Sequence, residues 1–220
     1  MEQETVLIYY TCLTHDEKIE QLCREQLLKA NLPIISVSRN EPIDFGDNIV
    51  VEGERGAITM HLQILAGLEY AASKGYKQVF LCESDVLYHP SHFDFTASDP
   101  TVFYYNVNVW KYHIDDKKFY WTDDMQQVSG SCASLTKMLE FYTRRNKQFA
   151  ETGFDRHYEA SERFGEKTEN WMSAEPNICI RHDKTLTRTK KSIADFKNKN
   201  KAKGWKVADS VEGWDLTKLK

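Results

Sequence analysis

The sequence has no long hydrophobic run and few cysteines, and each shortage excludes a class of protein. Nothing in the chain approaches the roughly 20 consecutive apolar residues of a membrane-spanning helix. The start carries only the short apolar run 6–10 and lacks the basic head of a signal peptide. The five cysteines are dispersed and form no Cys-x-x-Cys pair, which argues against a disulfide framework or a zinc knuckle. We therefore expect a reduced, cytoplasmic protein with no membrane span.

Length and composition fit one globular domain. The 220 residues are 41% hydrophobic and 28% charged, with a formal net charge of −4. A chain of this length buries roughly 70% of its unfolded surface, which is enough for a core without disulfide or metal staples. We therefore expect any metal site to serve function rather than folding.

The first third of the chain alternates strand-like and helix-like patterns. Apolar runs typical of buried strands occur at residues 5–12, 33–37 and 77–82. Helix-like segments separate them. This alternation predicts right-handed βαβ crossovers and a mostly parallel sheet. Such sheets bind ligands beyond the carboxyl ends of their strands.

The two helix-like segments carry signals for their ends. Thr14 and Glu17 form a predicted capping box before the first segment. Gly75 is placed as the left-handed cap of the second. The apolar positions expected to face the core of that second helix are Ile58, Leu62, Leu65, Ala66 and Ala72.

The second half of the chain has a different hydrophobic pattern. Residues 103–110 alternate with period two, which predicts a single strand that is antiparallel or at an edge. A helix is predicted at about residues 134–146, and a last short strand at residues 177–181.

A basic segment lies near the end of the chain. Residues 184–206 contain nine lysines and arginines and one acid, a local charge of +8 in a chain of net −4. Such asymmetry indicates a polyanionic partner or substrate, while a solvated lysine-rich helix is an equally open interpretation. We expect residues 1–183 to form the main domain, with residues 184–220 packed on it or extending from it.

Acidic residues follow the third predicted strand, and a histidine follows the last one. Glu83 and Asp85 are separated by one residue, and two carboxylates at a strand end can hold Mg²⁺ or Mn²⁺. His182 could add a third ligand, and Arg181 beside it could neutralise phosphate. Solvated loop acids and a surface histidine are the alternative interpretation. The remaining histidines show no metal-binding spacing and are assigned structural roles: His15, His61, His89, His92, His113 and His157.

Three segments resemble the successive motifs of a GT-A-type glycosyltransferase family found widely in bacteriophages. They are residues 83–93, residues 104–110, and residues 176–182 with Leu186 and Thr187. Some members of that broad group are linked to sugar addition on hydroxymethylated pyrimidines in DNA. Where many relatives have Glu-His-Asp, this chain has Glu-Ser-Asp at residues 83–85 and keeps both outer acids. The resemblance spans about residues 5–187 and implies a GT-A-like (Rossmann-like) α/β/α sandwich around a mostly parallel sheet.

The resemblance also implies a reaction and a site. The protein would move a sugar from a nucleotide diphosphate donor, expected to be a UDP-sugar, with Mn²⁺ or Mg²⁺ as cofactor. Asp85, with Glu83 directly or through water, would hold the ion, and His182 would close the site. The donor-binding residues would be Tyr10, Thr11, Cys12, Arg39, Arg55, Gly56 and Ser84. A helix start and a guanidinium both suit anionic groups, although solvated loop arginines at positions 39 and 55 are an open alternative.

The catalytic base and the acceptor are predicted from fewer residues. An inverting enzyme needs a carboxylate to deprotonate the acceptor hydroxyl, and the candidates are Asp155 and Glu175. The expected acceptor is 5-hydroxymethylcytosine in DNA, held by residues 184–206, in the cytoplasm of a phage-infected host. Three alternatives stay open: a glycosyltransferase for a cell-surface glycan, a DNA-binding module with a non-catalytic acid pair, and a metal-dependent nuclease.

Overall fold

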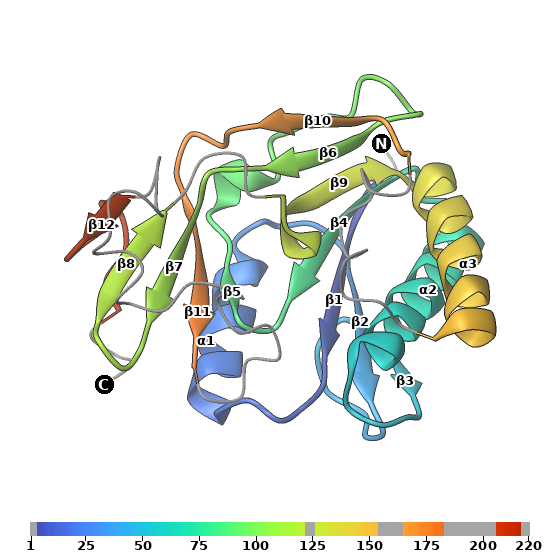
Figure 1. Cartoon of the computed structure of the whole chain (residues 1–220), viewed down its shortest axis with the longest axis horizontal. Helices are drawn as coiled ribbons and strands as arrows, with labels where there is room; N and C mark the ends of the chain where they lie inside the picture. The colour runs from blue at the N-terminus through green and yellow to red at the C-terminus, as the bar shows by residue number, and fades with distance from the viewer. Residues whose placement is uncertain (1–3, 122–125, 154–164, 183–205, 217–220) are drawn as a thin grey trace.

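The computed structural model describes residues 4–121, 126–153, 165–182 and 206–216, which form two sheets and three α-helices (Figure 1). A seven-stranded sheet has the order β10-β6-β9-β4-β1-β2-β3, and a five-stranded sheet has the order β12-β8-β7-β11-β5. The strands of the larger sheet are β1 (Thr5–Thr11), β2 (Ile34–Arg39), β3 (Asp47–Val51), β4 (Gln78–Glu83), β6 (Phe103–Asn106), β9 (Ser131–Ser134) and β10 (Thr168–Trp171). Those of the smaller sheet are β5 (Val86–Leu87), β7 (Val109–His113), β8 (Lys118–Trp121), β11 (Asn177–Arg181) and β12 (Lys206–Ala208).

The larger sheet is mostly parallel, as the sequence predicted. Strands β1, β2, β3 and β4 are parallel, as are β6 and β10, and β9 alone runs antiparallel to its neighbours β4 and β6. From β1 the chain moves outward through β2 to β3 and then returns to place β4 on the other side of β1. The strand order therefore reverses between β1 and β4, and a sheet of this kind binds ligands at such a reversal.

Helices cover the two faces of this sheet unequally. α2 (Ala57–Ser73) and α3 (Leu135–Thr152) pack side by side on one face, where they share a core with β1, β2 and β4 (Figure 1). α1 (Glu17–Leu28) lies on the other side and packs against the smaller sheet through Ile19 and Cys23. The predicted α/β class with a layered arrangement is confirmed.

The helix ends and faces differ in part from the predictions. Asp16, not Thr14, caps α1 by accepting a hydrogen bond from the Lys18 N–H. Gly75 has a φ of +83° just past α2, which confirms the predicted left-handed cap. The predicted inner face of α2 is right in part, because Leu65 and Ala66 pack against the core. It is wrong at Ile58 and Leu62, which are 45% and 40% exposed, and at Ala72, which is exposed. The positions of α2 that are buried are Thr59, His61, Gln63, Ile64, Gly67, Leu68 and Ala71.

One strand prediction and one loop prediction fail, and one strand prediction is confirmed. The chain at 103–110 forms two strands in different sheets, because the Asn106 Oδ1 accepts from the Asn108 N–H and turns the backbone between them. β3 forms inside a segment that we predicted as a loop. β11 matches its predicted bounds, and the predicted 134–146 helix exists but continues as α3 to Thr152.

The end of the chain returns to the smaller sheet. β12 pairs antiparallel with β8, and Val211 and Leu216 are buried in the core between that sheet and α1. The Trp214 Nε1–H donates to the Pro176 carbonyl at 2.8 Å. Residues 183–205, which hold nearly all of the basic segment, lie outside the described residues. Within the described part of the chain, no helix is long and apolar enough to cross a membrane.

Candidate functional site

A pocket lies at the carboxyl ends of β1 and β4, where the strand order of the larger sheet reverses. The end of β2, the first turns of α2 and the end of β11 complete its walls. Its lining residues are Tyr10, Cys12, His15, Arg39, Arg55, Gly56, Thr59, Met60, Gln63, Glu83, Ser84, Asp85 and Arg181. The pocket thus combines arginines with carboxylates and histidine at the position where parallel sheets bind ligands.

Six of the seven residues predicted to bind the donor line this pocket. The seventh, Thr11, has a buried side chain whose hydroxyl donates to Glu20 at 2.7 Å and accepts from the Leu13 N–H. Arg39 donates to the carbonyls of Cys12 and Gly53, each at 3.2 Å, so its guanidinium holds the pocket wall together while bringing positive charge to it.

Gln63 is a pocket residue that the sequence did not indicate. Its Nε2 donates to the carbonyls of Thr11 and Val37 at 2.8 and 2.9 Å, which ties α2 to the ends of β1 and β2. A glutamine on an apolar helix carries no motif, and its role becomes visible only when the strand ends are in place.

Glu83 is held by a neighbouring tyrosine. The Tyr10 hydroxyl donates to Glu83 Oε1 at 3.0 Å, and the two residues are partners in the β1–β4 register. Burial and the charge of Asp85 raise the pKa of the Glu83 carboxyl to about 7, although the Tyr10 hydrogen bond and Arg181 oppose the shift. A carboxyl in this state exchanges its proton near neutral pH.

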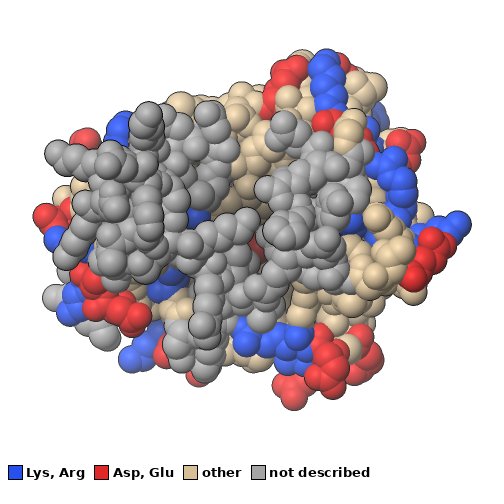
Figure 2. All heavy atoms as spheres, in the orientation of Figure 1, with Lys and Arg blue, Asp and Glu red and all other residues tan. Residues whose placement is uncertain are grey.

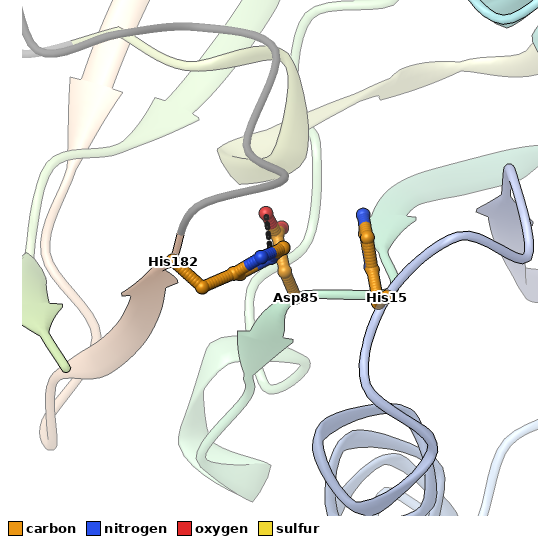
Figure 3. Close-up of side chains that lie close together, drawn as sticks. All are labelled: His15, Asp85 and His182. Atoms are coloured by element: carbon orange, nitrogen blue, oxygen red, sulfur yellow. Dashed lines mark ion pairs between the residues drawn. The ribbon is translucent and has the colours of Figure 1, made fainter.

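Three side chains from three separate elements meet at the edge of the pocket (Figure 3). One ligand atom from each of His15, Asp85 and His182 lies within 4.8 Å of the other two. His182 Nε2 is 3.8 Å from Asp85 Oδ2, and the two histidine rings lie edge to face with centroids 4.8 Å apart. The sequence predicted Asp85 and His182 as neighbours, but left His15 with a structural role because no spacing motif marks it.

Backbone pairing explains why Asp85 and His182 meet. β5 begins directly after Asp85 and pairs antiparallel with β11, which ends directly before His182. The Ile180 N–H donates to the Asp85 carbonyl at 2.8 Å. The two side chains are therefore positioned by a strand pair rather than by flexible loops.

His15 also contacts Ser84 and Cys12. Its Nδ1 is 3.1 Å from Ser84 Oγ, and its Nε2 is 3.8 Å from Cys12 Sγ. Burial raises the pKa of the Cys12 thiol, but hydrogen bonds from His15 and Thr14 outweigh it and lower that pKa to about 6. For His15, burial lowers the pKa while Cys12 and Asp85 raise it, and the net direction is upward.

The side chains fit a divalent metal ion. Two imidazoles and one carboxylate are a donor set that binds divalent transition metals, and an ion held on one side keeps positions for other ligands. Arg55 and Arg181 line the same pocket and suit anionic groups such as a diphosphate. The arrangement can hold an anion and a metal ion side by side.

The structure describes one of the two predicted catalytic carboxylates, Glu175, and it does not line this pocket. Glu175 is exposed and precedes β11, whose opposite end carries His182. A five-residue strand spans roughly 17 Å, so Glu175 lies well away from the cluster. Asp155 lies outside the described residues.

Comparison with known proteins does not establish a family for the chain. No protein-family model matches it, and no curated protein matches it. Among solved structures it is similar to a glycosyltransferase involved in the glycosylation of the major capsid of PBCV-1. That similarity has a TM-score of 0.48 and 12% sequence identity and covers 76% of this chain and 81% of the other. At these values it does not assign a function.

Proposed function

We propose that the protein is a metal-dependent glycosyltransferase that moves a sugar from a nucleotide diphosphate donor to a hydroxyl acceptor. The observation that carries the proposal is the pocket at the strand-order reversal, where the His15, Asp85 and His182 cluster lies beside arginines. A nucleotide diphosphate offers both the anion for the arginines and the oxygen ligands that an ion in the cluster would need. The sequence resemblance to GT-A-type glycosyltransferases supports the same reaction class.

The donor's parts match the walls of the pocket. Arg55 and Gly56 stand at the start of α2, where backbone N–H groups and a guanidinium both favour negative charge. Arg181, at the end of β11, lines the same pocket. We place the diphosphate between these elements and the nucleoside against the ends of β1 and β2, near Tyr10 and Cys12. A UDP-sugar is the proposed donor on the strength of the resemblance.

The transfer breaks the bond between the anomeric carbon and the diphosphate oxygen and forms one to the acceptor oxygen. A divalent ion, when bound, supplies stabilisation of the negative charge on the departing diphosphate. Arg181 and Arg55 add positive charge at the same place. The acceptor's proton passes to a carboxylate, for which Asp155 is the proposed base on sequence grounds, since the exposed position of Glu175 does not support it.

The proposed acceptor is 5-hydroxymethylcytosine in DNA, and a saccharide is the alternative. The support is the resemblance and the +8 charge of residues 184–206. The described lysines and arginines on the face shown in Figure 2 are interspersed with acids around the edge rather than gathered by sign. We therefore base the proposed electrostatic contact with DNA on the charge of the basic segment in the sequence.

Release of nucleotide diphosphate tests the proposal. A panel of UDP-sugars is incubated with Mn²⁺ and with hydroxymethylcytosine DNA, unmodified DNA, a saccharide mixture or no acceptor. We expect release to rise with the modified DNA and to be lost in Asp85→Ala, while Asp94→Ala, an exposed acid outside the pocket, keeps it.

Each of the other outcomes of this experiment would reject one part of the proposed function. Stimulation by the saccharides alone would reject the DNA acceptor and keep the transferase. Cleavage of plain plasmid DNA that depends on Asp85 would favour a nuclease. No turnover of any donor, with Asp85→Ala indistinguishable from the unaltered protein, would reject glycosyl transfer.

A further inference from the structure

His15 holds a position that the sequence patterns did not foresee. Its ligand atom lies within 4.8 Å of those of Asp85 and His182, from a loop that follows a different strand. We propose that His15 is a direct metal ligand, and that it completes the metal site in place of Glu83. The inference rests on the proposed function, which supplies the expectation of a metal ion, and it names the residues that bind the ion.

Glu83 is engaged elsewhere. Its Oε1 accepts a hydrogen bond at 3.0 Å from the hydroxyl of Tyr10, its register partner on β1. Among the described residues, the cluster of potential ligands close enough for one ion contains His15 and does not contain Glu83. Glu83 lines the pocket beside the cluster.

The loop that carries His15 is fixed on both sides. Before it, Leu13 adopts a φ of +54° and its N–H donates to the buried Thr11 hydroxyl at 3.1 Å. After it, Asp16 caps α1. A side chain between a strand end and a capped helix start needs little reordering to bind an ion.

The second ring nitrogen of His15 has a partner available. Ser84 Oγ is 3.1 Å from Nδ1, and Cys12 Sγ is 3.8 Å from Nε2. Metal-binding histidines usually hold their other nitrogen in a hydrogen bond, which fixes the ring orientation. Whichever nitrogen takes the ion, the other keeps a neighbour that orients it. When Nε2 takes the ion, the residue that orients the ring is Ser84, which we predicted as a donor-binding residue; when Nδ1 takes it, that residue is Cys12.

The ligand set has a consequence for the choice of metal. Mg²⁺ prefers an all-oxygen shell, whereas imidazoles favour transition metals. Two histidines and one aspartate therefore favour Mn²⁺ over Mg²⁺. With Glu83 in the place of His15, two carboxylates and one imidazole would weaken this preference.

Binding of the metal alone tests the inference, without any nucleotide sugar. Mn²⁺ affinity is measured by calorimetry, with Mg²⁺ as competitor, for the full chain and for His15→Ala, Glu83→Gln and His89→Ala. We expect His15→Ala to weaken Mn²⁺ binding by roughly 10- to 100-fold or more. His89→Ala, which removes a histidine outside the cluster, should bind as the unaltered protein does. Glu83→Gln should weaken binding far less than His15→Ala, because it removes nearby charge but no ligand. Circular dichroism melts verify that each variant is folded.

Pulsed electron paramagnetic resonance of the bound Mn²⁺ gives a second readout that a merely structural role would not change. The unaltered protein should show nitrogen couplings from two imidazoles and His15→Ala from one. Unchanged affinity and couplings in a folded His15→Ala, or loss of binding in Glu83→Gln alone, would overturn the inference. Mn²⁺ binding through His15 without turnover of any donor would leave the inference standing and reject the proposed transfer. No Mn²⁺ binding by the unaltered chain would reject the inference itself.

Discussion

At the residue scale, Cys12 is the cysteine with a reactive environment. It is half-buried, whereas the other four cysteines are buried. Hydrogen bonds from His15 and Thr14 overcome the opposing effect of burial and lower the pKa of its thiol to about 6. Because the thiolate is the nucleophile, we expect iodoacetamide to label Cys12 first, with a rate that falls as pH drops through about 6. Mass spectrometry across a pH series measures this rate, and a midpoint above pH 8 would contradict the account.

Ionisation of the pocket residue Glu83 should change the stability of the protein. Burial and Asp85 raise the pKa of its carboxyl from 4.5 to about 7, so the folded protein holds a proton that the unfolded chain releases. Stability should therefore fall as pH rises between these two values. We expect Glu83→Gln to raise the free energy of unfolding of the metal-free protein by about 1–3 kcal/mol at pH 8 and to change it little at pH 4. Urea denaturation at both values measures the effect, and equal shifts at both would show that ionisation is not the cause.

At the element scale, α2 approaches the sheet closely through a glycine. A Cβ on Gly67 would lie 2.8 Å from Ile8 Cγ2 and 3.0 Å from Val37 Cγ2. Gly67→Ala should therefore destabilise the protein by about 1–3 kcal/mol, although alanine is the better helix former. Urea denaturation gives the difference, with Ala72→Ser at an exposed position of the same helix as the control. A stabilised Gly67→Ala would mean that α2 can shift away from β1 and β2.

Most of the helices and strands, but not all, could be predicted from the sequence. Local patterns located β1, β2, β4, β11 and the three helices because each is a periodic or apolar run with its own end signals. They failed at β3, an edge strand with no buried residue, and at residues 103–110. There the Asn106 side chain accepts a hydrogen bond from the Asn108 N–H, and one pattern is divided between two sheets. The predicted inner face of α2 was right only in part, because that helix is apolar on most sides and its periodicity marks no single face.

The site was predictable to the extent that it lies at strand ends. Tyr10, Arg39 and Asp85 converge because parallel strands bring their carboxyl ends to one edge. His15 and Gln63 could not be foreseen, since their positions depend on a left-handed residue in a loop and on how α2 packs. No spacing rule in a single sequence encodes either contact.

At the scale of the whole molecule, residues 206–216 contribute to the core. Val211 and Leu216 are buried against α1 and the smaller sheet, and β12 extends that sheet. A chain truncated after residue 205 should lose about 1.5–3 kcal/mol for each of these two side chains. Thermal or urea unfolding of the truncated and full chains measures the loss. Equal midpoints would show residues 206–220 to be an appendage rather than part of the domain.

The central claim is that the pocket at the strand-order reversal binds a nucleotide diphosphate together with a metal ion. Calorimetric titration of UDP into the protein, with and without Mn²⁺, tests it most directly. We expect binding that requires Mn²⁺, that disappears in Asp85→Ala, and that persists in Asp94→Ala. UDP binding that is equally tight without the metal and in Asp85→Ala, or no UDP binding under any condition, would contradict the account.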